Sequence, residues 1–174
     1  RKGCTDFPKI VKKVCQALPD VSFRLLGTSG LYRTKEEVLA QFPENLRDKL
    51  EIIPQFIPEE LPKLLAACSV GIFPSYLEAF PFGVLEMLSA SLPAIAYNSP
   101  GAPMMLSPEY LVPPGDTNAM SAKVVSLLSD RIKLADARLW AKQQSQQFCW
   151  EQIAMQTSKI YWESWQRKQV NYSL

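Results

Sequence analysis

Two carboxylates, Glu78 and Glu86, stand eight positions apart in the segment Glu78-Ala-Phe-Pro-Phe-Gly-Val-Leu-Glu86. Two acids so placed can work as a general acid and base, or each can accept hydrogen bonds from ligand hydroxyls. The segment follows an apolar run, 70–73, that is typical of a short buried strand, and it ends in apolar residues at helical spacing. It therefore predicts a strand-to-helix corner, where open α/β sheets bind ligands and where a helix N-terminus attracts anions.

The chain contains no histidine, which limits the chemistry of this corner. Ser-His-Asp and Cys-His arrangements cannot be built, and the commonest general base is missing. The four cysteines, at positions 4, 15, 68 and 149, lack the C-x2-C spacing of zinc sites. We therefore expect no metal and no cofactor. Any reaction either needs no imidazole or takes one from elsewhere.

The composition is that of one soluble globular domain. The 174 residues are 47% hydrophobic and 21% charged, and the formal net charge is +2. This charge is too small to indicate nucleic acid or an anionic membrane as a partner. No apolar run reaches the roughly 18 residues of a membrane span, and the N-terminus does not look like a signal peptide. Free thiols in a chain of this size favour a cytoplasmic location.

Predicted strands and helices alternate along the chain. Short apolar runs predict strands at 21–26, 50–54, 70–73, 93–97 and 110–112. Periodic apolar residues predict helices at 7–18, 34–42, 58–67, 82–90, 117–128, 130–147 and 150–167. The predicted N-caps are Thr5 or Asp6, Thr34, Asp116 or Thr117, and Asp130. This order favours an α/β fold with a Rossmann-like parallel sheet, helices on both faces and extra C-terminal helices.

Several short motifs surround the two glutamates in a fixed order. They are Arg1-Lys2-Gly3, Phe73-Pro74-Ser75, Glu78 to Glu86, Ser99-Pro100-Gly101-Ala102-Pro103, Leu111-Val112-Pro113-Pro114-Gly115-Asp116 and Phe148-Cys149-Trp150-Glu151. Together they resemble the C-terminal, donor-binding half of family 4 glycosyltransferases, which have a GT-B fold and an E-x7-E signature. The resemblance covers nearly the whole chain. It implies retaining transfer of a sugar from a nucleotide diphosphate donor to an acceptor.

The resemblance also implies a role for each charged residue of the motifs. Lys2 would bind the donor pyrophosphate and help the nucleoside diphosphate to leave, since a compact ammonium suits phosphate oxygens. Glu78 would hold hydroxyls of the donor sugar, and Glu86 would hold both ribose hydroxyls. Lys2 and Glu78 are thus the predicted catalytic residues, and all three are predicted to bind donor. The alternatives are a solvated terminal lysine, an acid capping its own turn, and an acid that stabilises a helix N-terminus.

Phe80, Pro81, Phe82 and Gly83 lie between the two glutamates and are predicted to contact the donor. Their backbone N–H groups would face the sugar and the β-phosphate. Many relatives carry glycine at the position of Pro81, which has no N–H, so the amide that binds phosphate stays open. Gly83 allows close backbone approach, and Phe80 is either a core anchor or a wall of the sugar pocket. Gly27, in a glycine turn after a strand, would lie near the nucleotide.

The chain opens on Arg1-Lys2-Gly3 directly before a helix. In the resembled family a strand and a loop with an arginine precede this Lys-Gly pair. We therefore expect residues 1–174 to form a single nucleotide-sugar-binding domain that lacks its first strand and the N-terminal acceptor domain. That missing half would be its partner, and any peripheral membrane contact would be made only there. Trp162 and Trp165 are predicted to pack in the core, or else to face that half.

The predicted function is donor binding in a glycosyltransferase of the hexosyltransferase type, inactive as an isolated fragment. Two alternatives keep the same fold. One is a sugar-nucleotide epimerase or phosphorylase, which would bring an active-site histidine or a cofactor lysine motif, and the sequence contains neither. The other is a non-catalytic α/β interaction domain, against which the combination of Lys2, Glu78 and Glu86 argues.

Overall fold

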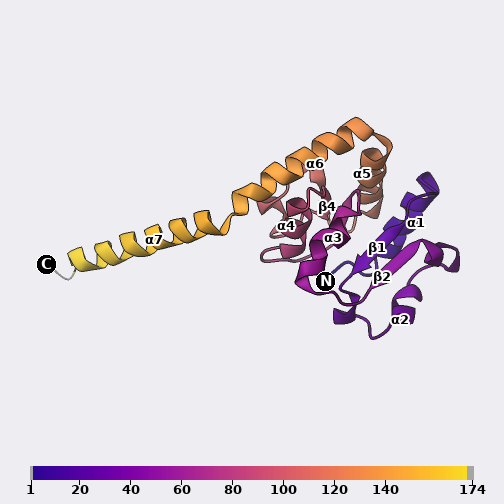
Figure 1. The fold of residues 1–174 in the computed structure, drawn as a ribbon, viewed down its shortest axis with the longest axis horizontal. Coiled ribbons are helices and arrows are strands. Elements are labelled where there is room, and N and C mark those ends of the chain that lie inside the picture. Colours follow the sequence, from indigo (N-terminus) through magenta and orange to yellow (C-terminus); the bar gives the residue numbers. More distant parts are fainter. Residues whose placement is uncertain (1, 172–174) are drawn as a thin grey trace.

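The computed structural model describes residues 2–171, and each predicted strand is present in it. The strands are β1 (Phe23–Leu26), β2 (Leu50–Ile53), β3 (Gly71–Phe73), β4 (Ala94–Tyr97) and β5 (Leu111–Val112). Every hydrogen-bonded pair of strands is parallel. The prediction of a parallel α/β fold is therefore confirmed (Figure 1).

Within the described residues the strands form two sheets, whereas the sequence predicted one. β1 pairs with β2, and β3, β4 and β5 pair in that order. A cavity of about 690 Å³ opens between the two sheets, and consecutive residues 22–26 and 70–74 line it from β1 and β3. Leu25 and Ile72 are apolar strand residues that stay only half-buried beside this cavity. The edges of β1 and β3 that face each other are thus separated by open space.

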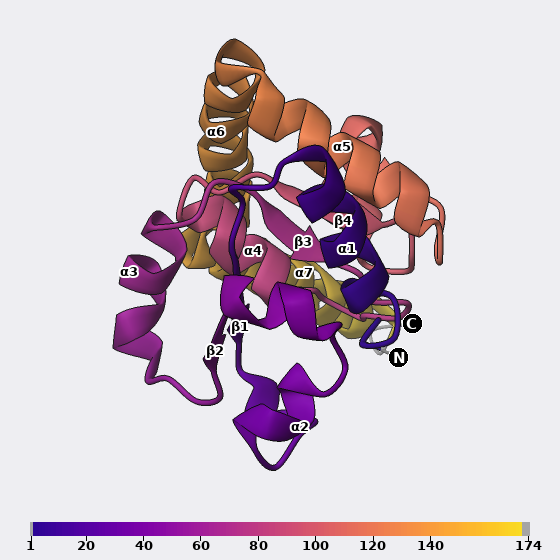
Figure 2. The same ribbon diagram turned by 90° about the vertical axis from the view of Figure 1, so that its right-hand side faces the viewer.

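Seven α-helices accompany the strands in the described part of the chain. They are α1 (Phe7–Ala17), α2 (Lys35–Leu39), α3 (Leu61–Ala66), α4 (Phe82–Ser89), α5 (Thr117–Ser129), α6 (Arg131–Ser145) and α7 (Trp150–Asn171). Short 3-10 helices are η1 (Thr28–Gly30), η2 (Glu44–Lys49), η3 (Pro58–Glu60), η4 (Ala102–Met104), η5 (Pro108–Tyr110) and η6 (Gln146–Phe148). α1 contacts α5, and α4 contacts α6. Figure 2 shows α1 in front of β3 and β4, so the larger sheet lies between two helical layers.

β4 is the centre of the hydrophobic core. Its four residues, Ala94 to Tyr97, are at most 1% exposed. β3 and β5 flank this strand, and α4 and α5 contact it, which explains why it is apolar throughout. On α1, Ile10, Val11 and Val14 are fully buried at the predicted helical spacing. Each buried side chain of this size stabilises the fold by about 1.5–3 kcal/mol.

The predicted helix caps explain where α2, α5 and α6 begin. Thr34, Asp116 and Asp130 each accept a hydrogen bond from a backbone N–H in the first turn of their helix, which confirms these caps. α1 is different. Asp6 occupies its N-cap position, but its side chain makes no capping hydrogen bond. The capping prediction is wrong here because the carboxylate accepts hydrogen bonds from two distant tyrosines.

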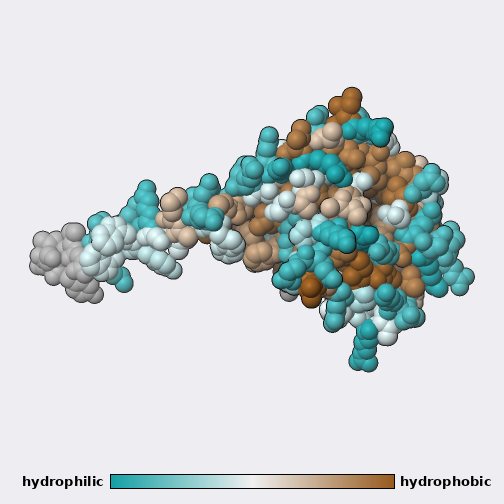
Figure 3. Space-filling view, in the orientation of Figure 1, coloured by the Kyte–Doolittle hydropathy of each residue, from teal (hydrophilic) through white to brown (hydrophobic). Residues whose placement is uncertain are grey.

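α7 extends away from the body of the molecule as a long arm (Figure 1). Trp150, Trp162 and Trp165 on this helix are 74%, 58% and 53% exposed. The prediction that its tryptophans pack in the core is therefore wrong, and Trp162 stacks on Trp165 with ring centroids 5.2 Å apart. Figure 3 shows mixed polar and apolar side chains along the arm. None of the helices among residues 2–171 has both the length and the apolar character that crossing a membrane would take.

Candidate functional site

The acidic loop that follows β3 is held against the turn that follows β4. The Glu78 N–H donates to the Pro100 carbonyl at 3.3 Å, and the Ser99 hydroxyl donates to the Ser75 carbonyl at 2.9 Å. Gly101 has a φ of +94°, and a Cβ at this residue would lie 2.6 Å from the Glu78 carbonyl oxygen. Only glycine permits this approach. The turn therefore fixes the backbone of Glu78.

The structure brings Lys2 and Glu78 into direct contact although 76 positions separate them. Lys2 Nζ lies 2.5 Å from Glu78 Oε1, and Ser75 Oγ donates to the same oxygen at 2.6 Å. The Glu78 side chain is 11% exposed and that of Lys2 is 46% exposed. Gly3 has a φ of +71° and packs against Pro74, which lets the N-terminal segment approach the loop. Ser75 was not predicted as a site residue, although its place three positions before Glu78 was a usable signal.

Gly27, which was predicted to lie near the nucleotide, lines the same cavity as Lys2. Lys2, Gly27 and Ser75 share the lining of a cavity of about 370 Å³. Gly27 has a φ of +71°, and its N–H donates to the Ile53 carbonyl at 2.9 Å. This left-handed residue turns the chain away from the end of β1. Arg1, the first residue of the motif that contains Lys2, lies outside the described residues.

The hydrogen bonds at the start of α4 show which backbone amide is available to an anion. Pro81 is the buried N-cap residue, and the Phe82 N–H donates to the Phe80 carbonyl at 2.9 Å. Phe80 is half-buried against the rings of Phe82 and Phe148, whereas Phe82 is 59% exposed. The contacts of the described residues give the Gly83 N–H no acceptor. Gly83 is therefore the amide at the positive end of α4 that is left for a ligand.

Glu86 lies further along α4 and lines the cavity between the sheets, together with Lys2 and Gly83. Its side chain is exposed to this cavity. Partial desolvation by the surrounding protein nevertheless raises the pKa of Glu86 above its ordinary value of 4.5. A carboxylate that is desolvated at the wall of a cavity is a candidate for ligand binding.

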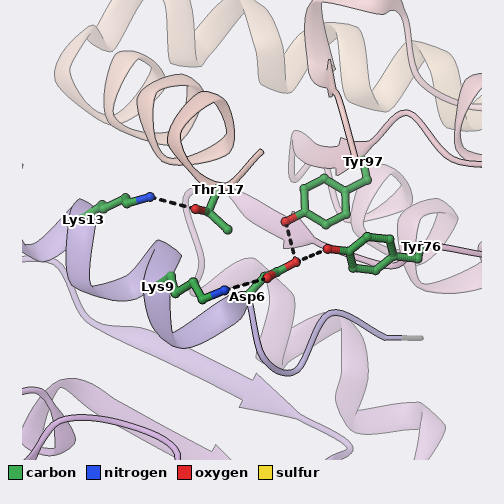
Figure 4. A network of polar contacts seen from close by, with 6 residues as sticks. All are labelled: Asp6, Lys9, Lys13, Tyr76, Tyr97 and Thr117. Carbon is green, nitrogen blue, oxygen red and sulfur yellow. Dashed lines mark hydrogen bonds and ion pairs between the residues drawn. The ribbon is translucent and has the colours of Figure 1, made fainter. Parts of the chain in front are cut away.

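A second polar cluster, centred on Asp6, was not predicted (Figure 4). Asp6 is 5% exposed, and its Oδ2 accepts hydrogen bonds from the hydroxyls of Tyr76 and of Tyr97, the latter at 3.0 Å. Lys9 Nζ lies 3.4 Å from its Oδ1. Burial alone would raise the pKa of Asp6, but the hydrogen bonds from the two tyrosines and Lys9 outweigh it and hold this pKa below 3.8. The tyrosines stand 70 and 91 positions away in the sequence, so no local spacing revealed them.

The site thus combines Lys2, Gly83 and Glu86, which line the cavity between the sheets, with Glu78, which lines neither cavity and contacts Lys2 in the loop after β3. Such groups can hold a ligand that carries both phosphate and several hydroxyls. Within residues 2–171, no three His, Cys, Asp or Glu side chains are grouped so that they could hold a metal ion.

Comparison with known proteins decides the family. The sequence profile of the family described as glycosyl transferases group 1 matches residues 1–130. The chain belongs to the group 1 glycosyltransferases. The O-antigen chain mannosyltransferase B of Escherichia coli is 34% identical over 110 residues, which are 61% of this chain and 28% of that protein. The sulfoquinovosyl transferase SQD2 of Arabidopsis thaliana is 24% identical over 182 residues, covering 98% of this chain and 34% of that protein.

Solved structures of other proteins share the fold of this chain. Sucrose-phosphate synthase from Thermosynechococcus elongatus superposes with a TM-score of 0.80 and 26% identity over 96% of this chain and 43% of that one. The pneumococcal O-GlcNAc transferase GtfA, solved with UDP and GlcNAc, gives a TM-score of 0.74 and 21% identity over 93% and 33%. The prediction of a GT-B glycosyltransferase fold is confirmed. The chain spans only 28% to 41% of the length of the curated relatives.

Proposed function

We propose that this chain binds a nucleotide diphosphate sugar and forms the donor half of a retaining, family 4 hexosyltransferase. The contact between Lys2 and Glu78 carries the proposal. In such a donor one oxygen joins the sugar to the β-phosphate, so the groups that hold phosphate and sugar hydroxyls must be neighbours. An ammonium and a carboxylate 2.5 Å apart, in a group 1 glycosyltransferase, meet this requirement. Structures of the same fold solved with UDP or UDP-glucose support a nucleotide-sugar ligand.

Each part of the donor has a partner in this proposal. Lys2 turns from Glu78 to the β-phosphate, and the Gly83 N–H donates to the same group. Glu78 keeps the hydrogen bond from Ser75 and accepts further ones from the sugar hydroxyls. Glu86 accepts hydrogen bonds from both ribose hydroxyls. The pyrophosphate then crosses the N-terminus of α4, where the helix dipole favours negative charge.

These contacts stabilise the charge that develops as the donor breaks. The bond between the anomeric carbon and the β-phosphate oxygen breaks, and its electron pair goes to the phosphate, where Lys2 and the Gly83 amide stabilise it. The acceptor hydroxyl attacks the same face of the sugar and gives its proton to the departing phosphate. Glu78 holds the ring in position for this attack. The reaction so described needs no histidine, and the chain contains none.

The acceptor side of the reaction is proposed to lie in an N-terminal half outside these residues. The chain spans 28% to 41% of the length of its curated relatives, which supports this division. The exposed Trp162 and Trp165 of α7 are proposed to contact that half. The isolated chain is therefore expected to bind donor without transferring sugar. A cytoplasmic location is also proposed, because the reducing cytoplasm keeps cysteines such as its four free ones in the thiol form.

We also propose that a strand preceding residue 1 fills the cavity between β1 and β3. Lys2 and Gly3 line this cavity, and Lys2 contacts the loop at the carboxyl end of β3. A strand that ends just before Lys2 would thus run parallel to both of its neighbours. α1 would then be the crossover from this strand to β1 in a right-handed βαβ unit. One continuous sheet would result, and it would cover Leu25 and Ile72.

Isothermal titration calorimetry with UDP-glucose and GDP-mannose tests donor binding by the chain. We expect saturable binding of at least one of them, and a loss of about tenfold or more in Glu86→Ala, because hydrogen bonds to a charged group are lost. Glu59→Ala is the matched control, since Glu59 is exposed in η3 and lies outside both cavities. A folded chain that binds no nucleotide or sugar nucleotide would instead indicate an interaction module.

A further inference from the structure

Asp6 is a buried carboxylate that the proposed reaction does not use. It is 5% exposed, and both tyrosine hydroxyls of its cluster reach the same oxygen, Oδ2 (Figure 4). A carboxylate is costly to bury unless hydrogen bonds and a counter-charge compensate it. Its position before α1 offered the simple role of a helix cap, which the side chain does not perform. The cluster therefore calls for another explanation.

Tyr76 connects this carboxylate to the acidic loop. It stands two positions before Glu78 and one after Ser75. Tyr76 remains 40% exposed, so hydrophobic burial of its ring does not account for a tyrosine at this position. The ring meets that of Tyr97 at 5.1 Å between centroids, and the hydroxyl reaches Asp6. The hydroxyl thus anchors the loop to the start of α1.

Asp6 also holds the segment that carries Lys2. The N–H groups of Asp6 and Phe7 both donate to the Gly3 carbonyl at 3.0 Å. They close the turn in which Gly3 adopts its φ of +71°. One residue therefore fixes the lysine segment through its backbone and the glutamate loop through its side chain.

We propose that Asp6 and Tyr76 are positioning residues that set where Glu78 stands relative to Lys2. The inference rests on the proposed function, because it assigns to this pair the recognition of the donor sugar. Tyr76 acts on the sugar end alone, since it anchors the loop of Glu78. Asp6 acts on both ends, since its turn also carries Lys2. Neither residue needs to touch the donor.

Tyr76→Phe tests the inference, because it removes one hydroxyl and leaves Asp6 before α1. Titration calorimetry compares the affinity for the sugar nucleotide with that for its nucleoside diphosphate, using UDP-glucose with UDP and GDP-mannose with GDP. We expect the sugar nucleotide to bind about tenfold more weakly in Tyr76→Phe, while the nucleoside diphosphate changes less than about twofold. Asp6→Asn keeps the backbone hydrogen bonds of the Gly3 turn and alters only the side-chain link to the loop, so it should likewise weaken binding of the sugar nucleotide more than that of the nucleoside diphosphate. Near-UV circular dichroism establishes that each variant is folded.

Tyr97→Phe is the matched control, because Tyr97 donates to the same carboxylate oxygen from buried β4 and not from the acidic loop. It should lower stability and leave the ratio of the two affinities unchanged. If Tyr76→Phe leaves the ratio unchanged, or if Tyr97→Phe lowers it equally, the positioning role is overturned and the cluster is purely structural. If the unaltered chain binds neither kind of ligand, the proposed function itself fails and takes the inference with it. Should Asp6→Asn not fold, Tyr76→Phe still decides the question.

Discussion

Replacing Gly3 with alanine should separate Lys2 from Glu78 and leave the rest of the fold in place. Gly3 has a φ of +71°, where alanine costs about 1–2 kcal/mol. The new Cβ would also lie 2.1 Å from the Pro74 carbonyl oxygen and 2.7 Å from the Pro74 Cβ. Pro74 is buried at the end of β3, so it cannot move aside easily. We therefore expect the N-terminal segment to move instead.

The magnitude follows from the contacts that this movement breaks. The Gly3 carbonyl loses hydrogen bonds from the Asp6 and Phe7 N–H groups, and Lys2 loses its ion pair with Glu78. A hydrogen bond contributes about 0.5–1.5 kcal/mol, and an ion pair as exposed as this one contributes about 0.2–1 kcal/mol. Gly3→Ala should therefore lower the free energy of unfolding by about 1–4 kcal/mol. Sugar-nucleotide affinity should fall about tenfold or more, because Lys2 leaves the site.

Urea unfolding followed by circular dichroism and titration calorimetry measure the two effects. Gly30→Ala is the control, because a Cβ at Gly30 meets no atom within 4 Å and Gly30 does not adopt a left-handed φ. Gly30 lines the cavity of about 370 Å³, so this variant controls for stability alone and should leave the free energy of unfolding unchanged. A destabilised Gly3→Ala that binds donor as tightly as the unaltered chain would refute the role of Lys2. An unchanged stability would refute the account of the Gly3 turn.

Four further predictions concern pH and the exposed arm. Because the pKa of Asp6 is lowered in the folded state, the charged carboxylate stabilises the fold above pH 3.8. This stabilisation is lost as the pH falls through the folded-state pKa. The loss of stability with falling pH, followed by circular dichroism, should therefore be shallower in Asp6→Asn. The raised pKa of Glu86 means that its charged form opposes folding at neutral pH, so Glu86→Gln should raise the Tm at pH 7 in calorimetry. Donor affinity should fall as the pH drops through this raised pKa, above 4.5, and Glu86→Gln should abolish that dependence in titrations. Trp165→Gln should alter the free energy of unfolding by less than about 0.5 kcal/mol in urea, because this side chain is 53% exposed, and a larger loss would show that α7 packs on the body.

Local sequence patterns predicted the elements well because their causes are local. Apolar runs located each strand within about two residues, and Thr34, Asp116 and Asp130 mark helix starts through hydrogen bonds within one turn. The aromatic residues of α7 show the limit of periodicity. Apolar residues at helical spacing predict that one face of the helix is buried, but they do not indicate which surface packs against that face. For that reason the core prediction for Trp162 and Trp165 was wrong.

The site required contacts between residues far apart in the sequence. Lys2 and Glu78 could be named from the motifs, but the contact between them depends on the left-handed Gly3 and on Pro74. Thr5 or Asp6 was predicted to cap α1, and only the fold shows that hydroxyls from the acidic loop and from β4 donate hydrogen bonds to the Asp6 carboxylate. Which amide at the start of α4 lacks an acceptor likewise depended on a contact that the sequence does not reveal, the hydrogen bond from the Phe82 N–H to the Phe80 carbonyl.

The most direct test of the central claim is to follow the seven glycine amides by NMR during titration with a sugar nucleotide. Selective 15N-glycine labelling gives one signal for each glycine. Gly27 and Gly83, which line the two cavities, are the glycines proposed to contact the donor. We predict that addition of UDP-glucose or GDP-mannose shifts the Gly83 amide most, because its N–H would donate to the β-phosphate, and that Gly27 shifts with it. Saturable binding that leaves Gly83 and Gly27 unmoved, or no binding at all by the folded chain, would contradict the account.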